Sequence, residues 1–134
     1  MDRIDYVKSC KYLNSHVTEF GNDGLWFKVL YWGATPKHYS NPVHRHSFFE
    51  VCYVLEGSGI YAEEDQEETV LEAGSAFYSK PGVWHQIRSE MGMYLLFFAF
   101  EVVEERSDPE AYRQYMKLLA VDRSCLTVKE DDPF

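Results

Sequence analysis

Residues 43–59 read VHRHSFFEVCYVLEGSG, an apolar stretch that carries several ionisable side chains. If this segment is a regular strand, alternate side chains share one face. That face would present His44, His46, Phe48, Glu50 and Cys52. The two histidines and the glutamate are metal-ligand types, and the opposite face is mainly apolar. Both faces are therefore expected to be covered, as they are in a closed barrel.

A second segment, GSAFYSKPGVWH at residues 74–85, supplies a further ligand candidate. A glycine opens its first turn, a Pro-Gly pair forms the next, and a histidine starts another strand. Together the two segments offer three imidazoles and one carboxylate: His44, His46, His85 and Glu50. This set suits iron(II), nickel, manganese or zinc and leaves positions open for water or a ligand. The alternative is that these groups only hydrogen-bond one another or an organic ligand in the lumen.

The surrounding apolar segments are short and are separated by glycine, proline or charged clusters. They cover residues 25–32, 44–56, 59–63, 68–74, 75–79, 84–90 and 93–103. Segments of this length and spacing favour an antiparallel sandwich or barrel. After residue 107 the pattern changes, because Asp108 is a candidate N-cap and Pro109 suits a first helical turn. Apolar residues then recur at helical spacing, which predicts one amphipathic helix.

Composition limits the possible functions. The 134 residues suffice for one domain, with 13 Lys and Arg against 22 Asp and Glu and a net charge of -9. Such a chain is not expected to bind DNA by itself. Three cysteines without CxxC spacing predict no disulfide framework, and no segment resembles a signal peptide or a membrane span. We therefore expect a soluble cytoplasmic domain that does not contact a membrane. The last segment, VDRSCLTVKEDDPF, shows no helix terminus or strand partner, so we expect the chain to continue.

The spacing H-x-H-x3-E-x6-G resembles the first motif of the cupin superfamily and is present as His44, His46, Glu50 and Gly57. The second cupin motif resembles the segment with Gly74, Gly82 and His85 at the family's spacing. Pro81 comes one place late, and Ser89 stands where the family has asparagine. The resemblance implies an all-β fold, a double-stranded β-helix or jelly roll with a short C-terminal helix. It also implies a metal site inside the barrel.

Residues 25 to 105 are similar to the N-terminal effector-binding domain of AraC-type transcriptional regulators, through NPVHRHSFFEVCYVLEGSGIY, PGVWH and YLLFFAFE. There a sensor cupin precedes a helical linker and two helix-turn-helix motifs. The resemblance implies an N-terminal arm (1–24), a cupin sensor domain (25–107), and a C-terminal helix with a truncated linker (108–134). The linker would lead towards a missing DNA-binding domain.

The same resemblance implies a small-molecule effector such as a sugar, contact with DNA only through the missing domain, and no catalysis. A homodimer is one expectation, although such regulators often dimerise through helices beyond a short cupin segment, so a monomer stays open. The alternative is a stand-alone metal-dependent cupin enzyme, a dioxygenase or isomerase, whose metal acts as a Lewis acid or activates oxygen.

Four aromatic residues are candidate ligand contacts, although each also suits ordinary core packing: Phe48, Tyr53, Tyr78 and Trp84. Trp84 differs from the others because it lies in a loop beside His85. Cys52 is expected to be a buried, unreactive thiol. His16 and His38 are isolated in the sequence and are expected on the surface.

Overall fold

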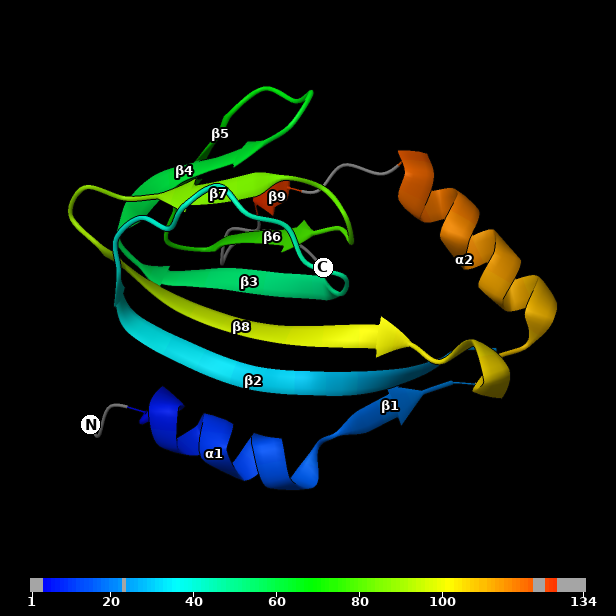
Figure 1. Ribbon diagram of the computed structural model, residues 1–134. Coiled ribbons are helices and arrows are strands. Elements are labelled where there is room, and N and C mark those ends of the chain that lie inside the picture. The colour runs from blue at the N-terminus through cyan, green and yellow to red at the C-terminus, as the bar shows by residue number, and fades with distance from the viewer. Residues whose placement is uncertain (1–3, 23, 122–124, 128–134) are drawn as a thin grey trace.

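The computed structural model describes residues 4–22, 24–121 and 125–127, and shows two antiparallel sheets that face each other (Figure 1). The larger sheet contains, in spatial order, β1 (Glu19–Gly21), β2 (Trp26–His38), β8 (Met93–Val102), β3 (Phe49–Glu56), β6 (Ser75–Ser79) and β9 (Cys125–Thr127). The smaller sheet contains β5 (Thr69–Glu72), β4 (Ser58–Glu63) and β7 (His85–Arg88). The other elements are α1 (Tyr6–His16), the 3-10 helix η1 (Glu104–Arg106) and α2 (Pro109–Val121). The predicted all-β fold with a C-terminal helix is confirmed.

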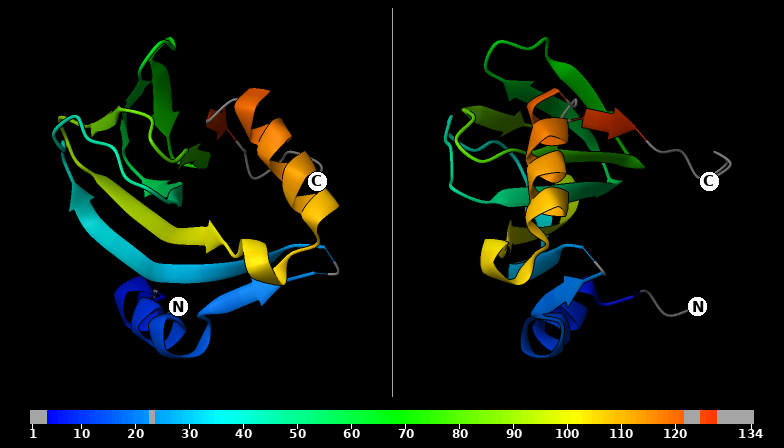
Figure 2. Two further views of the ribbon diagram at one scale, coloured as in Figure 1. Left: turned by 45° about the vertical axis from the view of Figure 1, so that its right-hand side comes forward. Right: turned by 90° about the vertical axis from the view of Figure 1, so that its right-hand side faces the viewer.

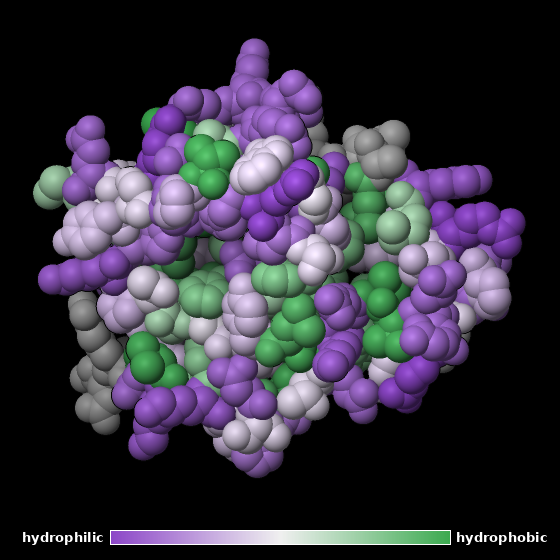
Figure 3. Space-filling model, viewed as in Figure 1, coloured by the Kyte–Doolittle hydropathy of each residue, from purple (hydrophilic) through white to green (hydrophobic). Residues whose placement is uncertain are grey.

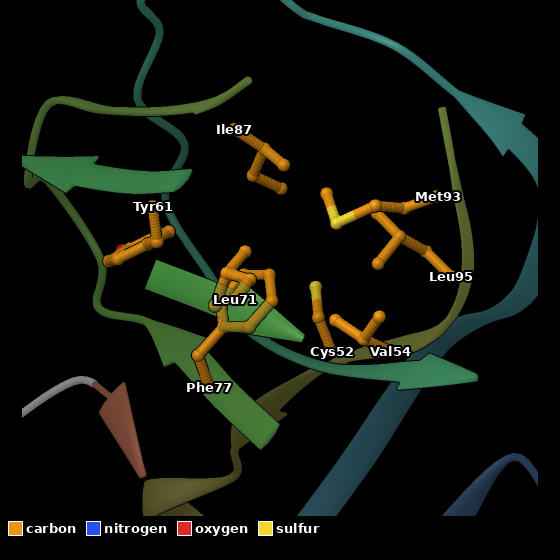
Figure 4. Close-up of a cluster of buried hydrophobic side chains, with 8 residues drawn as sticks. All are labelled: Cys52, Val54, Tyr61, Leu71, Phe77, Ile87, Met93 and Leu95. Carbon is orange, nitrogen blue, oxygen red and sulfur yellow. The ribbon is translucent and has the colours of Figure 1, made fainter. Parts of the chain in front are cut away.

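The core lies between the two sheets, where the inward-facing side chains of both meet (Figure 4). Its buried members are Cys52, Val54, Tyr61, Leu71, Phe77, Ile87, Met93 and Leu95. Burying one aliphatic or aromatic side chain of this size contributes about 1.5–3 kcal/mol. On β3 the core residues alternate with outward-facing ones, so the strand divides the barrel lumen from the outer surface of the sheet.

Strand β2 is longer than the sequence predicted, because it continues past Gly33 and Pro36 as far as His38. Gly33 lies opposite Phe97 of β8, and a Cβ at Gly33 would come within 2.2 Å of the Phe97 ring. The glycine therefore makes room for this ring instead of ending the strand. Pro36 falls in an irregularity of the β2–β8 register, where a residue without an N–H group is tolerated.

Helix α2 confirms the prediction for the segment after residue 107. The backbone N–H of Ala111 donates to the Asp108 carboxylate at 3.0 Å, as expected of an N-cap. Tyr115 of α2 contacts the rings of Phe27 and Phe49, so the helix packs against the sheet through its aromatic face. After α2, residues 125–127 form β9 and pair with β6. The expectation that the last segment lacks a strand partner is wrong for these three residues, and 122–124 and 128–134 lie outside the described residues.

The segment predicted as an N-terminal arm contains helix α1 and strand β1. The Asp5 carboxylate accepts a hydrogen bond of 3.0 Å from the Lys8 N–H and caps the helix. Tyr6, Cys10 and Leu13 recur at helical spacing and turn towards the sheet. Figure 2 shows α1 lying along the outer side of β2, away from the lumen.

The surface in Figure 3 is largely hydrophilic, and apolar side chains reach it only in separate patches. Residues 64–68, of which four are acidic, connect β4 to β5, and Glu68 pairs with Arg88 of β7. Among the described residues, no helix has the length and apolar character needed to span a bilayer.

Candidate metal and ligand site

Backbone hydrogen bonds bring the two motif segments together. The expected regular strand from His44 is wrong at its start, since β3 begins only at Phe49. His44 instead forms a bridge with His85: its N–H donates to the His85 carbonyl at 3.0 Å, and the His85 N–H donates back at 2.8 Å. The Gly82 N–H also donates to the His46 carbonyl at 2.8 Å. These contacts join segments that are far apart in the sequence.

The result is a group of three imidazoles at the barrel lumen. His44, His46 and His85 each place one ring nitrogen within 4.8 Å of the others. His85 is only 2% exposed, and the other two rings are half-buried. The sequence predicted these three histidines as a set together with Glu50, and the structure brings the three histidines together.

The three rings are each held by a contact between Nδ1 and the nearby backbone. Each Nδ1 lies within hydrogen-bond distance of a carbonyl oxygen two residues away: that of Pro42, Phe48 and Val83, at 2.8, 2.8 and 2.9 Å. A carbonyl oxygen can only accept, so each Nδ1 holds the proton and each Nε2 carries the lone pair. The Nε2 atoms of His46 and His85 are buried without a hydrogen-bond partner. An unsatisfied buried polar atom costs about 1–3 kcal/mol, and a metal ion would satisfy both.

Burial also prepares His85 to act as a ligand. It lowers the pKa of His85, and the neighbouring His44 and His46 lower it further. The Val83 carbonyl and the Glu50 carboxylate partly oppose this shift. The ring is therefore neutral near pH 7, which is the state that binds a metal.

Glu50 lies apart from the three histidines, although it lines the same cavity. Its carboxylate accepts a hydrogen bond from the Tyr31 hydroxyl and contacts the Cys52 thiol at 3.8 Å. Burial, followed by this hydrogen bond, raises the pKa of Tyr31, so the hydroxyl stays protonated and donates. Of the four predicted ligands, the three histidines thus form a close group, and His44 of this group lines one cavity together with Glu50, which is bonded elsewhere. Burial raises the pKa of Cys52 well above its usual value, which agrees with the buried thiol that the sequence predicted.

A cavity of about 230 Å³ opens beside the histidines, and we call it the lumen cavity. Its polar wall includes His38, His44 and Glu50, and its apolar wall includes Cys52, Leu95 and Phe97. The volume equals the liquid volume of about seven or eight water molecules. A ligand held entirely within it must be small.

His38 belongs to this cavity, and the prediction that it lies on the surface is wrong. Its ring is half-buried at the end of β2, and its Nδ1 is buried without a hydrogen-bond partner. Burial lowers the pKa of His38. The carbonyl groups of His38 and Tyr39 oppose the shift, but neither completes a hydrogen bond of normal geometry with Nδ1. No motif marks this residue. His16, in contrast, is exposed as predicted and stacks on Tyr12.

The four aromatic ligand candidates occupy different places. Phe48 stacks on His46, with ring centroids 4.1 Å apart, and so lies beside the histidines. Tyr53 is on the outer side of the sheet, facing α1, and Tyr78 pairs with the outward-facing Val51. Trp84 is 41% exposed, and the Arg45 guanidinium lies over its ring at 4.7 Å. None of the four is among the described residues that line the lumen cavity.

Comparison with known proteins identifies the class to which this fold and this histidine group belong. The cupin domain model matches residues 31–98, just over half of the chain, so the chain belongs to the cupin family. An uncharacterized HTH-type transcriptional regulator of Bacillus subtilis, YfiF, is 43% identical over 98 residues. The match covers 73% of this chain and 31% of YfiF, so the chain spans less than a third of this curated relative.

Solved structures resemble the chain at lower identity. Protein NMB1881 from Neisseria meningitidis is 17% identical with a TM-score of 0.47, and the match covers 75% of this chain and all of that one. A cupin-2 domain protein from Shewanella frigidimarina is 21% identical with a TM-score of 0.44, and the match covers 71% of this chain and 91% of that one. Oxalate decarboxylase from Bacillus subtilis, described with Mn(II) centres, is 17% identical with a TM-score of 0.44. The match covers 60% of this chain and 26% of that one.

Proposed function

We propose that this chain is the effector-binding domain of an AraC-type transcriptional regulator, and that a small metabolite in the lumen cavity controls DNA binding elsewhere in the protein. One observation carries the proposal. Three histidines with the same tautomer form a close group beside a small cavity that His44 and Glu50 line, in a cupin whose curated relative is an HTH-type regulator. The net charge of -9 supports contact with DNA through another domain, since this chain would repel phosphates.

The histidine group fits a divalent transition metal, and we propose that zinc, nickel, iron(II) or manganese binds there. His44, His46 and His85 would hold the ion through Nε2, while the Nδ1 hydrogen bonds keep each ring in position. The ion would supply a positive charge that anchors an oxygen or nitrogen atom of the effector. Glu50 adds a negative charge to the same wall, so hydroxyl groups of a sugar would find an acceptor there.

Effector binding would act by favouring one arrangement of the chain over another. A ligand shifts such an equilibrium only by its different affinity for the two states. Helices α1 and α2 are the elements outside the barrel that could change position, because each contacts the large sheet from its surface. We propose that the regulator works in the cytoplasm and as a dimer, with this chain binding its effector without turning it over.

The test uses the full-length protein and a DNA fragment from its own promoter. Fluorescence anisotropy would measure DNA affinity with a panel of sugars and related metabolites, for metal-loaded and chelator-treated protein. We expect one metabolite to change DNA affinity in the wild type but not in His85→Ala, with His16→Ala as the matched control. A panel that leaves DNA affinity and oligomeric state unchanged would contradict the regulatory role.

A metal-dependent enzyme is the second candidate, because three protein ligands leave coordination positions open. Elemental analysis of protein purified without an affinity tag tests the first requirement. Stoichiometric metal together with oxygen consumption or isomerisation of a sugar substrate would favour this candidate. Metal without turnover would favour the effector-binding role.

A further inference from the structure

A second cavity lies outside the barrel, between helix α1 and the outer surface of the large sheet. We call it the α1 chamber, and its volume is about 180 Å³. The residues that define its walls are Tyr6, Cys10 and Leu13 of the helix and Trp32, Tyr53 and Phe98 of the sheet. None of the described residues that line it carries a charged side chain. Burial raises the pKa of Cys10, which agrees with apolar surroundings.

The chamber exists because α1 is fastened near its two ends. Near its C-terminus, the Asn14 amide bonds the Trp32 backbone twice, at 2.9 and 2.7 Å, and the Trp32 indole N–H donates to the Val17 carbonyl at 2.7 Å. At its start, the Tyr6 ring meets the Tyr94 ring edge to face. No residue of α1 is fully buried, so the middle of the helix leaves space above the sheet.

The α1 chamber and the lumen cavity are separated by one layer of sheet. Gly33 pairs with Phe97, and Phe97 pairs with Cys52, across three adjacent strands. Cys52 and Phe97 line both cavities, while their sequence neighbours Tyr53 and Phe98 line only the chamber. The same patch of sheet therefore forms the floor of the chamber and a wall of the lumen.

The chemistry of the chamber restricts what it can bind. The Trp32 indole N–H in its wall is already used, since it donates to the Val17 carbonyl. The other polar side chains of the lining are uncharged hydroxyl and thiol groups, so a charged ligand would lose its hydration without gaining an oppositely charged partner. Aromatic rings favour edge and stacked contacts with another ring. The volume is slightly above that of an engineered apolar cavity of about 150 Å³ that binds benzene.

We propose that the α1 chamber is a second ligand site, independent of the metal, that takes a small uncharged aromatic molecule of one or two rings. The ligand would touch α1 on one side and the sheet on the other. It can therefore bind only while the helix is docked, and binding stabilises the docked state. Helix α1 would then respond to a ligand other than the one in the lumen.

Indole is a suitable probe, and Cys10 reports on the chamber. Cys10 is partly exposed and Cys52 is 2% exposed, so alkylation in a Cys125→Ser background modifies Cys10 first. We expect indole to slow this alkylation about tenfold at a concentration of ten times its Kd. NMR spectra should show shifts in α1 and in outward-facing residues of β2, β3 and β8, with or without a chelator present.

Two serines of α1 give a matched pair of variants. Both serines are exposed, and only Ser9 is among the residues that line the chamber. Ser9→Phe should fill the space and weaken indole binding by about tenfold or more, whereas Ser15→Phe should bind as the wild type does. Equal binding by the two variants would overturn the proposal. Binding of benzoate at the chamber with the same affinity as indole would also overturn it. The same holds if indole, up to its solubility limit, causes no NMR shifts in the wild type or causes them only in residues of the lumen.

Discussion

The lumen cavity and the α1 chamber share a wall but have opposite chemistry. On the lumen side, Glu50, His38 and His44 line the cavity, whereas the chamber side has no charged group among its described lining residues. Both surfaces come from the same strands, because consecutive side chains point to opposite faces. On β3, Glu50 and Cys52 face the lumen, while Val51 and Tyr53 face α1. A shift of one residue in strand register would exchange the two surfaces.

The substitution with the largest expected effect should change metal binding at the lumen and leave ligand binding in the α1 chamber unchanged. His46→Ala removes one of the three grouped histidines and should weaken zinc or nickel binding by more than about 100-fold. Loss of a residue that only hydrogen-bonds to a metal ligand weakens binding by about 10- to 100-fold, and loss of a ligand itself should cost more. Competition with a chromophoric chelator measures this affinity. Indole protection of Cys10 should stay at the wild-type level. His16→Ala is the control, and unchanged metal affinity in His46→Ala would show that the histidines are not a metal site.

A substitution in the shared wall should affect both cavities. Gly33→Ala places a Cβ within 2.2 Å of the Phe97 ring, which must then move. Overpacking of this kind costs about 1–3 kcal/mol of unfolding free energy. Urea denaturation measures the loss, and both metal affinity and indole binding should fall. Lys37→Ala, an exposed change on the same strand, should stay within about 0.5 kcal/mol of the wild type.

A smaller effect, confined to the lumen, should follow from pH. Burial lowers the pKa of both His38 and His85 below the ordinary value of about 6.5. For each histidine, at pH values between its lowered pKa in the folded chain and its ordinary pKa in the unfolded chain, the unfolded chain binds more protons than the folded one. The metal-free protein should therefore have its full stability above pH 6.5 and lose it progressively as the pH falls. His38→Gln should reduce this slope and His16→Gln should not, as thermal unfolding at several pH values would show.

The histidine group was largely predictable, because its members lie in two segments with fixed spacing. The backbone bridge between His44 and His85 was not predicted, because a regular strand was expected at His44. The position of Glu50 was not predictable in the same way. Its hydrogen-bond partner Tyr31 comes from β2, and the contact depends on how β2 and β3 are placed on either side of β8. The two motif segments contain no information on that placement.

Two other features were missed for different physical reasons. Pro36 indicated the end of a strand, but an irregular register carries β2 past it and brings His38 to the lumen. Helix α1 has an N-cap at Asp5 and apolar residues at helical spacing, yet its 11 residues are too few to be stable alone. Its helical state depends on docking to the sheet, which a local pattern does not reveal.

The smallest expected effect concerns this docking. Asn14→Ala removes two hydrogen bonds to the Trp32 backbone and should cost about 1–2 kcal/mol, all of it in the attachment of α1. Faster Cys10 alkylation and weaker indole binding should follow, while metal affinity stays unchanged. Ser15→Ala, which loses only a weak contact of 3.4 Å on the same helix, is the control. If Asn14→Ala also weakened metal binding, the single sheet layer between the cavities would transmit changes from one side to the other. The independence of the two sites would then be lost, because release of α1 would reach the histidines through Phe97 and Cys52.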